Sequence, residues 1–522
     1  MDKTRLHPSR RPASAVATPL SILDATVARF SATGAIWLFD EPTVPKSSSS
    51  HVTEESLLDH LQSSLVVTLN DFPQWAGQIH WAPVRPGGSH TERFNRPMVT
   101  YGTENDPGVE WAVVRHQHLS VKSLVPSADE RASGQGVWRA DQFNQDLFLS
   151  RTLLPLYNLR DCDGLPAMQV QINLFDDGGY GIGVKLAHVL ADAQSLMVFV
   201  HLWAVNCRKA FSVDGHSPSS VFGPPVFDPA QLDSCAAGNI DVETPDAQIL
   251  EEARQLPLHR FNWWGAEDPG YSPFFIPTTN NSIPPGEKIL SQVSPSTPAP
   301  WPTWNLSRPV SCALLHFPSS SLARLKQKAS SSTGGQNISR LDALLAHIWA
   351  LVNKARGHGQ SSDEVFLNFT LGARSRLSLP DSFIGSPLFI THIRMPGRSA
   401  CLGTTVAAQI RRTLNLFTAD KVGAMLHDAA YEVSPQRLWQ AFVGSQHTLV
   451  TSWLRLQLYD VDFVGIGQRP RYVHAVMPKI DGCLQVMDSG IDDGGIDIAL
   501  YLDAEAMERL LQDKPDEFTM AA

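Results

Sequence analysis

His188 and Asp192, a histidine and an aspartate four residues apart, are the residues of this chain whose types and spacing could do chemistry. The unperturbed pKa of an imidazole is roughly 6.5, so a partly buried histidine can take a proton from a substrate and return it. An aspartate one helical turn away can orient the turn or cap the following helix. A core histidine and a helix N-cap would produce the same pair, so both interpretations stay open at this point.

The residues around this pair predict a strand, a short turn and a helix. Every second residue from Tyr180 to His188 is apolar or the histidine itself, which is typical of a strand with one buried face. We therefore expect His188 at the end of that strand, on its buried side. After Asp192, apolar residues recur at helical spacing as far as Phe211. His188 and Asp192 should both lie on the turn.

Three glycines, Gly179, Gly181 and Gly183, precede His188. Their spacing is not that of a dinucleotide-binding loop, and they lie inside a strand that leads to a histidine. We expect close backbone approach or a bulge there. Residues 167–175 predict a partner strand, joined to the first one as a hairpin through residues 176–179. The chain has no G-x-S-x-G, P-loop or H-E-x-x-H motif.

Composition excludes several classes of function. The chain has 522 residues and a formal net charge of -10, with no cluster of Lys and Arg, so we expect no nucleic acid or anionic membrane as partner. No apolar run reaches the roughly 18 residues of a membrane span. The six cysteines are scattered without a C-x-x-C pair, which predicts reduced thiols, no metal site and a cytoplasmic location.

The organisation along the chain predicts two mixed halves around an irregular middle. Strands and helices follow one another in a similar loose order in both halves, unlike a doubly wound sheet. The middle, rich in Pro and Ser, should wrap over the surface with one short helix near residues 244–255 and pack through Trp263-Trp264 and Phe274-Phe275. The predicted parts are a disordered tail (1–17, with a targeting segment as the alternative), an N-terminal domain (18–213), a crossover linker (214–309) and a C-terminal domain (310–522).

Secondary structure outside the central turn follows from periodicity and turn residues. The predicted helices are 53–69, 319–329, 338–354, 400–416, 437–441 and 503–512. The predicted strands are 35–39, 78–82, 93–101, 108–115, 310–317, 365–371, 447–454, 459–463, 474–477, 483–487 and 496–502.

A distant block, residues 451–470, resembles the T-S-W … D-F-G-W-G-x-x-P block of the BAHD acyltransferases. Members of that family also carry H-x-x-x-D at a strand end near mid-chain. Residues 337–356 resemble the family's helix S-x-x-D-A-L-x-A-H-x-W, residues 371–377 resemble its D-x-R-x-R strand end, and Asp481-Gly482 resembles its late strand pair. These matches occur in the family's order over roughly residues 20 to 510.

The chain departs from the family pattern at several positions. Ala193 follows Asp192 where many members have Gly, and residues 462–467 are one residue longer than D-F-G-W-G and lack its Trp. Residues 383–386 read Phe-Ile-Gly-Ser in place of Y-F-G-N. With the long Pro/Ser-rich crossover, these features are similar to the fungal branch, which includes the trichothecene O-acetyltransferases.

The resemblance implies an α/β fold with mixed sheets, built as two chloramphenicol acetyltransferase-like domains with an active-site channel at their interface. It implies transfer of an acyl group, acetyl among the candidates, from acyl-CoA to a hydroxyl of a small-molecule secondary metabolite. Acyl-CoA would be a cosubstrate and no cofactor would be bound permanently. We expect a monomer.

The resemblance also implies roles for individual residues. His188 would deprotonate the acceptor, which attacks the thioester directly, and would then protonate the leaving thiolate. Asp192 would hold the turn through an ion pair with Arg374, and the alternative is that Asp192 only caps its own helix. Thr451 and Trp453 would donate hydrogen bonds to the oxyanion, although core packing explains Trp453 equally well.

Five further residues are implied in supporting roles. Asp462, Gly465 and Gly467 would shape the domain interface away from the reacting atoms. Ser339 and Arg340, at the start of a helix, would contact coenzyme A, since a helix N-terminus suits phosphate. A simple helix cap at Ser339 is the alternative.

Two rival interpretations stay open. One is a transferase like the condensation domains of peptide synthetases, with a carrier-bound donor or an amine acceptor; Ala187 occupies the position where those domains usually have a first histidine. The other is a non-catalytic binding protein of the same fold, which the intact His188 disfavours.

Overall fold

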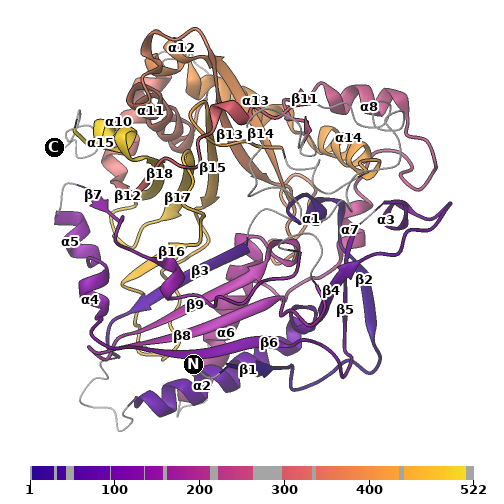
Figure 1. The fold of residues 1–522 in the computed structure, drawn as a ribbon, viewed down its shortest axis with the longest axis vertical. Coiled ribbons are helices and arrows are strands. Elements are labelled where there is room, and N and C mark those ends of the chain that lie inside the picture. Colours follow the sequence, from indigo (N-terminus) through magenta and orange to yellow (C-terminus); the bar gives the residue numbers. More distant parts are fainter. Residues whose placement is uncertain are drawn as a thin grey trace.

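Two large sheets, one below the other in Figure 1, organise the structure, which is a computed structural model. The first sheet is built mainly from the N-terminal half and the second mainly from the C-terminal half. The structure describes residues 3–28, 32–42, 52–94, 96–133, 136–156, 162–211, 221–262, 297–331, 337–403, 405–433 and 440–512, and all structural statements concern these residues.

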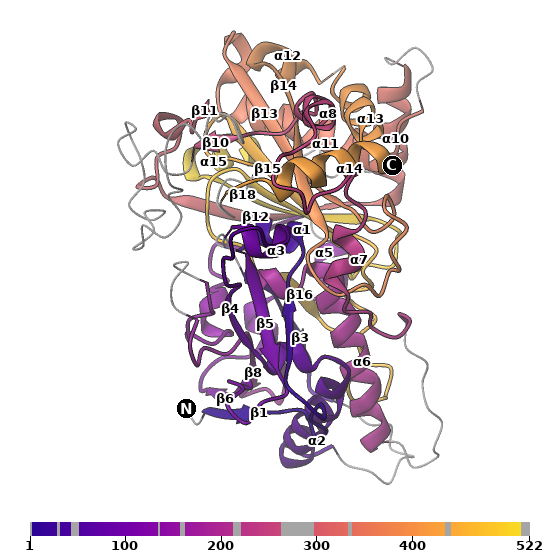
Figure 2. The same cartoon turned by 90° about the vertical axis from the view of Figure 1, so that its right-hand side faces the viewer.

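The first sheet has six strands in the order β1-β6-β8-β9-β3-β16. β6 and β8 run parallel, and the other neighbours are antiparallel. Two long helices, α2 and α6, lie beside each other and bury apolar side chains against it (Figure 2). The strands are β1 (Lys3–Leu6), β3 (Ala32–Phe39), β6 (Val109–His116), β8 (Met168–Phe175), β9 (Tyr180–Ala187) and β16 (Tyr472–Ala475), and the helices are α2 (Glu54–Thr68) and α6 (Ala193–Phe211).

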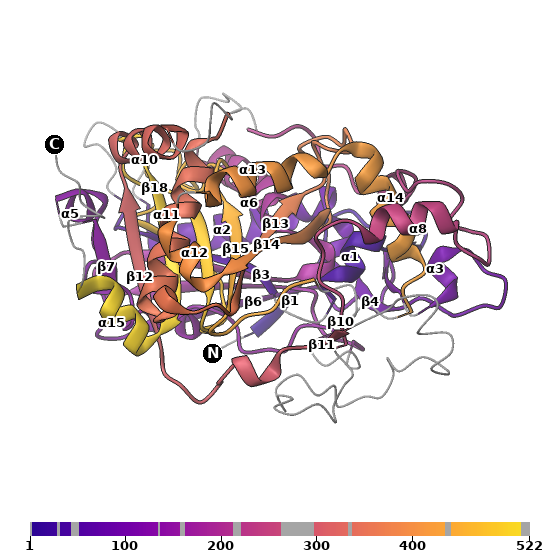
Figure 3. The ribbon, with the colours of Figure 1, turned by 90° about the horizontal axis from the view of Figure 1, so that it is seen from above.

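The second sheet has seven strands in the order β14-β13-β15-β17-β18-β12-β7. Helix α11 supplies much of its core, because nearly every apolar residue from Leu344 to Val352 is buried. Figure 3 shows α10, α11 and α13 gathered over these strands. The strands are β7 (Val137–Arg139), β12 (Val310–Phe317), β13 (Glu364–Gly372), β14 (Leu388–Pro396), β15 (His447–Trp453), β17 (Cys483–Asp488) and β18 (Ile496–Asp503). The helices are α10 (Ser319–Ser331), α11 (Arg340–Ala355), α12 (Gly397–Leu402), α13 (Val406–Leu416), α14 (Ala419–Ala430) and α15 (Ala504–Gln512).

One strand from each half of the chain pairs in the sheet of the other half. β7 comes from the N-terminal half but pairs with β12, and β16 comes from the C-terminal half but pairs with β3 (Figure 1). The mixed α/β class predicted from the sequence is confirmed. The boundary expected near residue 310 separates most strands, but these two strands lie across it.

The N-terminal segment departs from the expectation of a disordered tail. Lys3–Leu6 forms β1 and pairs antiparallel with residues 109–112 of β6. The Lys3 ammonium contacts the buried Glu110 carboxylate at 3.1 Å and the Thr152 hydroxyl at 2.5 Å. The polar sequence predicted disorder because pairing with a strand a hundred residues away leaves no local periodicity.

A smaller sheet and several short helices complete the first half. The sheet order is β2-β5-β4. The strands are β2 (Val16–Pro19), β4 (Gln78–Trp81) and β5 (Pro97–Tyr101), and the helices are α1 (Ile22–Thr26), α3 (His90–Arg93), α4 (Val121–Leu124) and α5 (Ala128–Ser133).

The crossover between the halves carries regular structure where it is described. Its elements are α7 (Pro229–Asp233), α8 (Ala247–Arg254), β10 (Phe261–Asn262) and β11 (Thr297–Pro298). α8 lies against α14, close to the helix predicted at residues 244–255. The predicted packing of Trp263-Trp264 and Phe274-Phe275 lies outside the described residues.

Three predicted elements differ from the structure. The strand predicted at 93–101 begins only at Pro97, because Arg93 belongs to α3. Residues 459–463 form no strand, because the Asp488 carboxylate accepts the backbone N–H of Arg455 and Leu458 and fixes an irregular turn. The helix predicted at 400–416 is two helices separated by Gly403, whose φ of 69° ends α12. Most of the helix predicted at 437–441 lies outside the described residues.

Within the described residues, none of the six cysteines forms a disulfide. Within the described part of the chain, no helix combines the length and apolar character needed to cross a bilayer.

Candidate active site

His188 begins the turn between β9 and α6. β9 ends at Ala187, residues His188–Leu190 form one turn of 3-10 helix, and α6 starts at Ala193. The predicted buried face is correct from Tyr180 to Leu186, whose side chains lie in the core. His188 does not continue that face. Because the backbone leaves the strand at this residue, its half-buried ring lies with Lys185 and Ala187 on the wall of a cavity.

The cavity at His188 has a volume of about 750 Å³, within the size range of small-molecule sites. Its walls come from parts of residues 141–156, from the His188 turn and from residues 476–479. Lys185 fixes one wall, since its ammonium donates to the carbonyls of Ser150 at 2.7 Å and Thr152 at 3.2 Å. Burial lowers the pKa of Lys185 to about 8.

Gly183 allows the backbone of Phe148 to lie directly against β9. A Cβ at this position would lie 2.0 Å from the carbonyl oxygen of Phe148. Only glycine leaves room for that backbone, so the close approach expected at the glycines before His188 is present.

The His188 ring is held by one hydroxyl group. Its Nδ1 lies 3.0 Å from Ser386 Oγ, and the same hydroxyl donates a short hydrogen bond to the His188 carbonyl oxygen. Burial lowers the pKa of His188, while the charge of Asp192 raises it by less. The imidazole is therefore predominantly neutral near pH 7 and can accept a proton.

Asp192 points away from that hydroxyl and makes a two-pronged ion pair. Arg374 donates from Nη1 to Asp192 Oδ2 at 2.6 Å and from Nη2 to Oδ1 at 2.9 Å. Oδ1 also accepts the backbone N–H of Ser195 at 2.9 Å, so Asp192 caps α6 as well. Burial alone would raise the pKa of Asp192, but the charge and hydrogen bonds of Arg374 hold it below its usual range.

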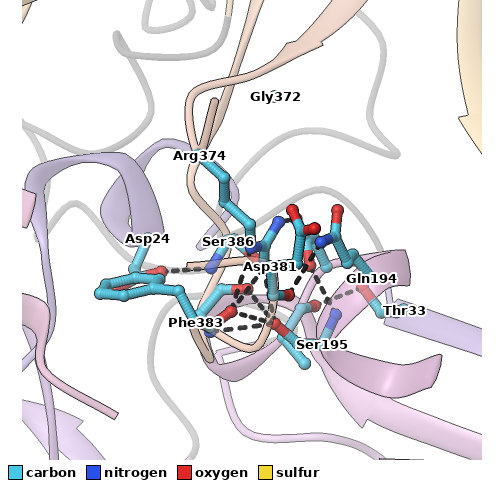
Figure 4. Close-up of polar contacts among 12 residues, drawn as sticks. Asp24, Thr33, Gln194, Ser195, Gly372, Arg374, Asp381, Phe383 and Ser386 are labelled. Atoms are coloured by element: carbon cyan, nitrogen blue, oxygen red, sulfur yellow. Dashed lines mark hydrogen bonds and ion pairs between the residues drawn. The ribbon is translucent and has the colours of Figure 1, made fainter. Parts of the chain in front are cut away.

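Residues 383–386 connect the two sides of the turn. The Arg374 guanidinium also donates to the Phe383 carbonyl oxygen, and the Ser195 hydroxyl donates to the Gly385 carbonyl oxygen (Figure 4). The Asp192 N–H donates to the same Gly385 carbonyl at 2.9 Å. The segment therefore lies directly on the turn between His188 and α6.

Asp24 lies behind this segment and was not predicted as a site residue. Its Oδ1 accepts the backbone N–H of Ser386 at 2.5 Å (Figure 4), and its Oδ2 accepts the N–H and hydroxyl of Ser21. Gly385 has a φ of 145°, and a Cβ there would lie 2.9 Å from Asp24 Oδ1. The sequence contains a weak signal for each of Asp24 and Ser386. Asp24 belongs to a capping pattern, Ser21-x-x-Asp24, and Ser386 departs from the family's Y-F-G-N.

Thr451 and Trp453 do not line the cavity at His188. They share the face of β15 opposite to Val450, which packs among the helices of the second half. Trp453 is buried in the apolar core of the first half, which is the packing alternative. The Thr451 Oγ1 is buried, and no described group hydrogen-bonds to it.

Asp462, Gly465 and Gly467 form one tight turn. The Asp462 carboxylate accepts the N–H of Gly465 and of Gly467, both at 2.8 Å, and both glycines have positive φ. Arg208, near the end of α6, donates to the Asp462 carbonyl oxygen at 2.7 Å. At about 1.5 Å per residue along α6, this contact lies roughly 25 Å from the His188 turn.

Ser339 is the N-cap of α11. Its hydroxyl accepts the N–H of Asp342 at 3.0 Å, and the Asp342 carboxylate accepts the N–H of Ser339 at 2.7 Å. Arg340 is exposed and donates to the Ser319 hydroxyl at 3.2 Å. The cap alternative for Ser339 is therefore present.

Within the described ranges, no three His, Cys, Asp or Glu side chains are arranged to hold a metal ion. The chemistry available at the cavity is proton transfer by a neutral imidazole beside a space for a small molecule.

Comparison with known proteins agrees with this geometry. The family model "Transferase family" matches residues 142–233 and 305–517, more than half of the chain. Acyltransferase AFT15-1 of Alternaria alternata is 27% identical over 500 residues, covering 92% of this chain and 89% of that protein. Acyltransferase abl6 of Leptosphaeria maculans is 27% identical over 498 residues, covering 94% and 90%.

A solved structure shares the fold. TRI101 of F. graminearum, complexed with coenzyme A and deoxynivalenol, superposes with a TM-score of 0.63 and 16% identity over 97% of this chain and 98% of that chain. The two-domain architecture expected from the resemblance is thereby confirmed. The chain belongs to the Transferase family and is an acyltransferase of the BAHD type, similar to fungal members.

Proposed function

We propose that the chain transfers an acyl group from acyl-CoA to a hydroxyl of a small-molecule secondary metabolite, with His188 as general base. The observation that carries the proposal is the imidazole of His188 on the wall of a cavity of about 750 Å³, in contact with a hydroxyl rather than with a carboxylate. Support for coenzyme A and a small acceptor comes from TRI101, whose structure holds coenzyme A and deoxynivalenol.

The proposed reaction is direct transfer. The acceptor hydroxyl gives its proton to His188 as its oxygen attacks the thioester carbonyl, so no acyl-enzyme forms. The imidazolium then protonates the leaving thiolate of coenzyme A, which returns His188 to the neutral form. Holding both substrates against one base turns a bimolecular reaction into an effectively unimolecular one.

Asp192 takes the orienting role in this proposal. Both carboxylate oxygens of Asp192 accept hydrogen bonds from Arg374, and among the described residues the side-chain partner of the His188 ring is Ser386 rather than Asp192. We propose that the ion pair holds the first turn of α6, and with it the backbone of His188, in place.

Thr451 is our candidate for stabilising the oxyanion. A buried hydroxyl without a partner is costly unless a ligand uses it, and Thr451 Oγ1 is such a group within the described chain. Because Thr451 does not line the cavity, the thioester would have to reach it from another direction. We leave Trp453 out of the mechanism because it packs in the core.

The supporting roles expected from the resemblance also stay proposals. We propose Asp462, Gly465 and Gly467 as a structural turn that ties the C-terminal half to α6. Arg340 is the better of the two candidate contacts to coenzyme A, since the Ser339 hydroxyl is already engaged as a helix cap.

A panel of acyl-CoA donors, each incubated with candidate hydroxyl acceptors, tests the proposal by detection of free thiol. We expect turnover that His188→Ala lowers about a thousandfold. His201→Asn is a matched control, because His201 is buried in α6 and does not line the cavity. If purified His188→Ala kept the wild-type rate, the assignment of the base would be wrong.

The rival donor and acceptor classes are arms of the same experiment. Acyl groups on a carrier protein replace acyl-CoA in one arm, and amine acceptors replace alcohols in another. Faster turnover with the carrier protein would favour the condensation-domain type, and no turnover in any arm would favour a binding protein. Scattered cysteines without a disulfide among the described residues are typical of a reducing compartment, and we propose that the chain acts in the cytoplasm as a monomer.

A further inference from the structure

We infer that Ser386 is a positioning residue that keeps the proton of His188 on Nδ1, so that Nε2 is the basic atom, and that Asp24 holds Ser386 in place. The inference rests on the proposed function, in which His188 is the general base. It goes further by assigning the reacting nitrogen and by naming two residues outside the H-x-x-x-D pair that determine it.

The tautomer follows from counting protons at Ser386. A serine hydroxyl has one proton to donate and two lone pairs that accept. That proton points to the His188 carbonyl oxygen, which can only accept. The 3.0 Å contact to His188 Nδ1 must therefore be one in which the ring donates and the hydroxyl accepts. Nδ1 then carries the hydrogen, and Nε2 carries a lone pair.

Nε2 is also the free nitrogen of the ring. His188 lines the cavity, and no described residue hydrogen-bonds to its Nε2. The Nδ1 contact to Ser386 fixes this tautomer, and it leaves the lone pair on the side where an acceptor hydroxyl can approach.

Asp24 fixes the position of Ser386. The Ser386 side chain has no solvent exposure, and its backbone N–H reaches Asp24 Oδ1 at 2.5 Å. The other carboxylate oxygen is held by Ser21, so Asp24 cannot rotate away without breaking three hydrogen bonds. Gly385 packs directly on Asp24, which restricts the segment further.

Asp24 is an unusual group to bury. It is 1% exposed, its hydrogen-bond partners are the neutral Ser21 and Ser386, and no described ion pair includes it. Burial raises its pKa to about 7. Asp24 is thus a buried carboxyl group without an ion pair, and it binds the residue that contacts His188. This arrangement indicates a role beyond stability.

Other titratable groups near His188 must be considered when its pH profile is measured. Asp192 is held ionised by Arg374. The cavity wall adds the charged side chains of Asp141, Asp146, Arg151, Lys185 and Lys479. These groups are unchanged in the variants below, so a shift between variant and wild type reports on the Ser386 contact.

The experiment combines a spectrum with kinetics. Protein labelled with 15N-histidine gives a long-range 15N–1H spectrum in which the two tautomers of His188 differ, and His188→Ala assigns the signal. We expect the wild-type ring to be protonated on Nδ1. In Ser386→Ala we expect this tautomer preference to weaken and kcat to fall 10- to 100-fold, with the KM of the donor within about twofold.

Two further variants separate positioning from stability. Ser386→Thr keeps the hydroxyl and should recover most of kcat, and Asp24→Asn should lower kcat about 3- to 10-fold with a partial loss of the tautomer preference. Ser382→Ala is the matched control, because Ser382 is a buried serine in the same segment and makes no described side-chain hydrogen bond. We expect it to leave kcat unchanged.

Each outcome decides the inference. A wild-type ring protonated on Nε2 would overturn it, whether or not any variant folds. A folded Ser386→Ala with at least half of wild-type kcat and an unchanged spectrum would also overturn it. If His188→Ala stays fully active, the proposed function fails, and the spectrum still decides whether Ser386 sets the tautomer.

Discussion

Two histidines of this protein, His188 and His316, have opposite surroundings. His188 contacts a neutral hydroxyl through Nδ1 and opens on a cavity through the rest of its ring. His316, on β12, is held at both nitrogens by carboxylates, with Nδ1 2.7 Å from Asp497 and Nε2 2.9 Å from Asp493. Both ring nitrogens of His316 are bound by carboxylates, so this residue can only link structural elements. His188 keeps Nε2 without a described hydrogen bond, so it can exchange a proton with a substrate.

The pKa values of the two rings are shifted in opposite directions. Burial lowers the pKa of His188 and leaves it neutral. Burial also lowers the pKa of His316, but the hydrogen bonds and charges of Asp497 and Asp493 outweigh it and raise the pKa above its ordinary value. His316 therefore keeps its proton to a higher pH than an ordinary histidine and pairs with Asp497, its direct partner on β18, whereas the lowered pKa of His188 favours a neutral ring that can accept a proton.

The largest effect expected from this contrast is on turnover. His188→Ala should lower kcat about 10³-fold with little loss of stability, because the ring borders a cavity. His316→Gln should leave kcat within about twofold and cost about 1–3 kcal/mol of stability, because Asp497 is left buried without its donor. Thiol release and denaturant midpoints of the two variants measure both effects. Equal losses of kcat would remove the distinction.

The Asp192–Arg374 pair should behave like the His316 cluster, as a structural ion pair. Arg374→Met leaves a buried carboxylate unpaired and should cost about 3–5 kcal/mol of stability. Asp192→Leu added to Arg374→Met should recover part of that loss, which denaturant midpoints can show. Asp192→Asn alone should affect stability more than the pH–rate profile. A displaced profile with unchanged stability would instead make Asp192 part of the proton transfer.

Asp24 gives a pH dependence of the opposite sign to an ordinary ion-paired carboxylate. Its pKa is raised from 3.8 to about 7 in the folded protein, so folding favours the protonated form. The stability from this group is complete below about pH 4 and falls as pH rises to about 7, by about 4 kcal/mol in total. Asp24→Asn should flatten this part of the stability curve, which denaturant midpoints from pH 4 to pH 8 would show.

His316 should contribute in a different window. Its folded pKa lies above the unfolded value near 6.5, so its stabilisation is present below that pH and is lost as pH rises through the folded pKa. The stability difference between wild type and His316→Gln should therefore be larger at pH 5.5 than at pH 9. This is the smallest of the expected effects, and a difference independent of pH would mean that folding does not raise the pKa of His316.

Local sequence patterns predicted most helices and strands, because residues on the buried face of a helix or strand recur at regular spacing in the sequence. The strand at 310–317 matches β12, and the helix at 338–354 lies within two residues of α11. The turn between β9 and α6 was also predicted, along with Arg374 as the partner for Asp192. The family resemblance was needed for that partner, since the two residues are 182 positions apart.

The contacts that set the state of His188 could not be predicted from local patterns. Ser386 is 198 residues from His188, and Asp24 is 362 residues from Ser386. The alternation of β9 also predicted that the His188 ring lies on the buried face of the strand. This was wrong, because periodicity cannot show that the strand ends in a 3-10 turn at His188. Pairing of the N-terminal strand β1 was missed for a similar reason, as only distant residues stabilise it.

The exchange of strands between the halves has a consequence for synthesis of the chain on the ribosome. β3, a strand buried along almost its whole length, pairs with β9 on one edge and with β16, residues 472–475, on the other. β16 is synthesised long after β3, because almost the whole C-terminal half up to residue 472 lies between them. Until then the nascent chain presents an open, apolar strand edge of the kind that recruits other chains. A prematurely terminated product would keep this edge open and should be prone to aggregate, even though His188 is present.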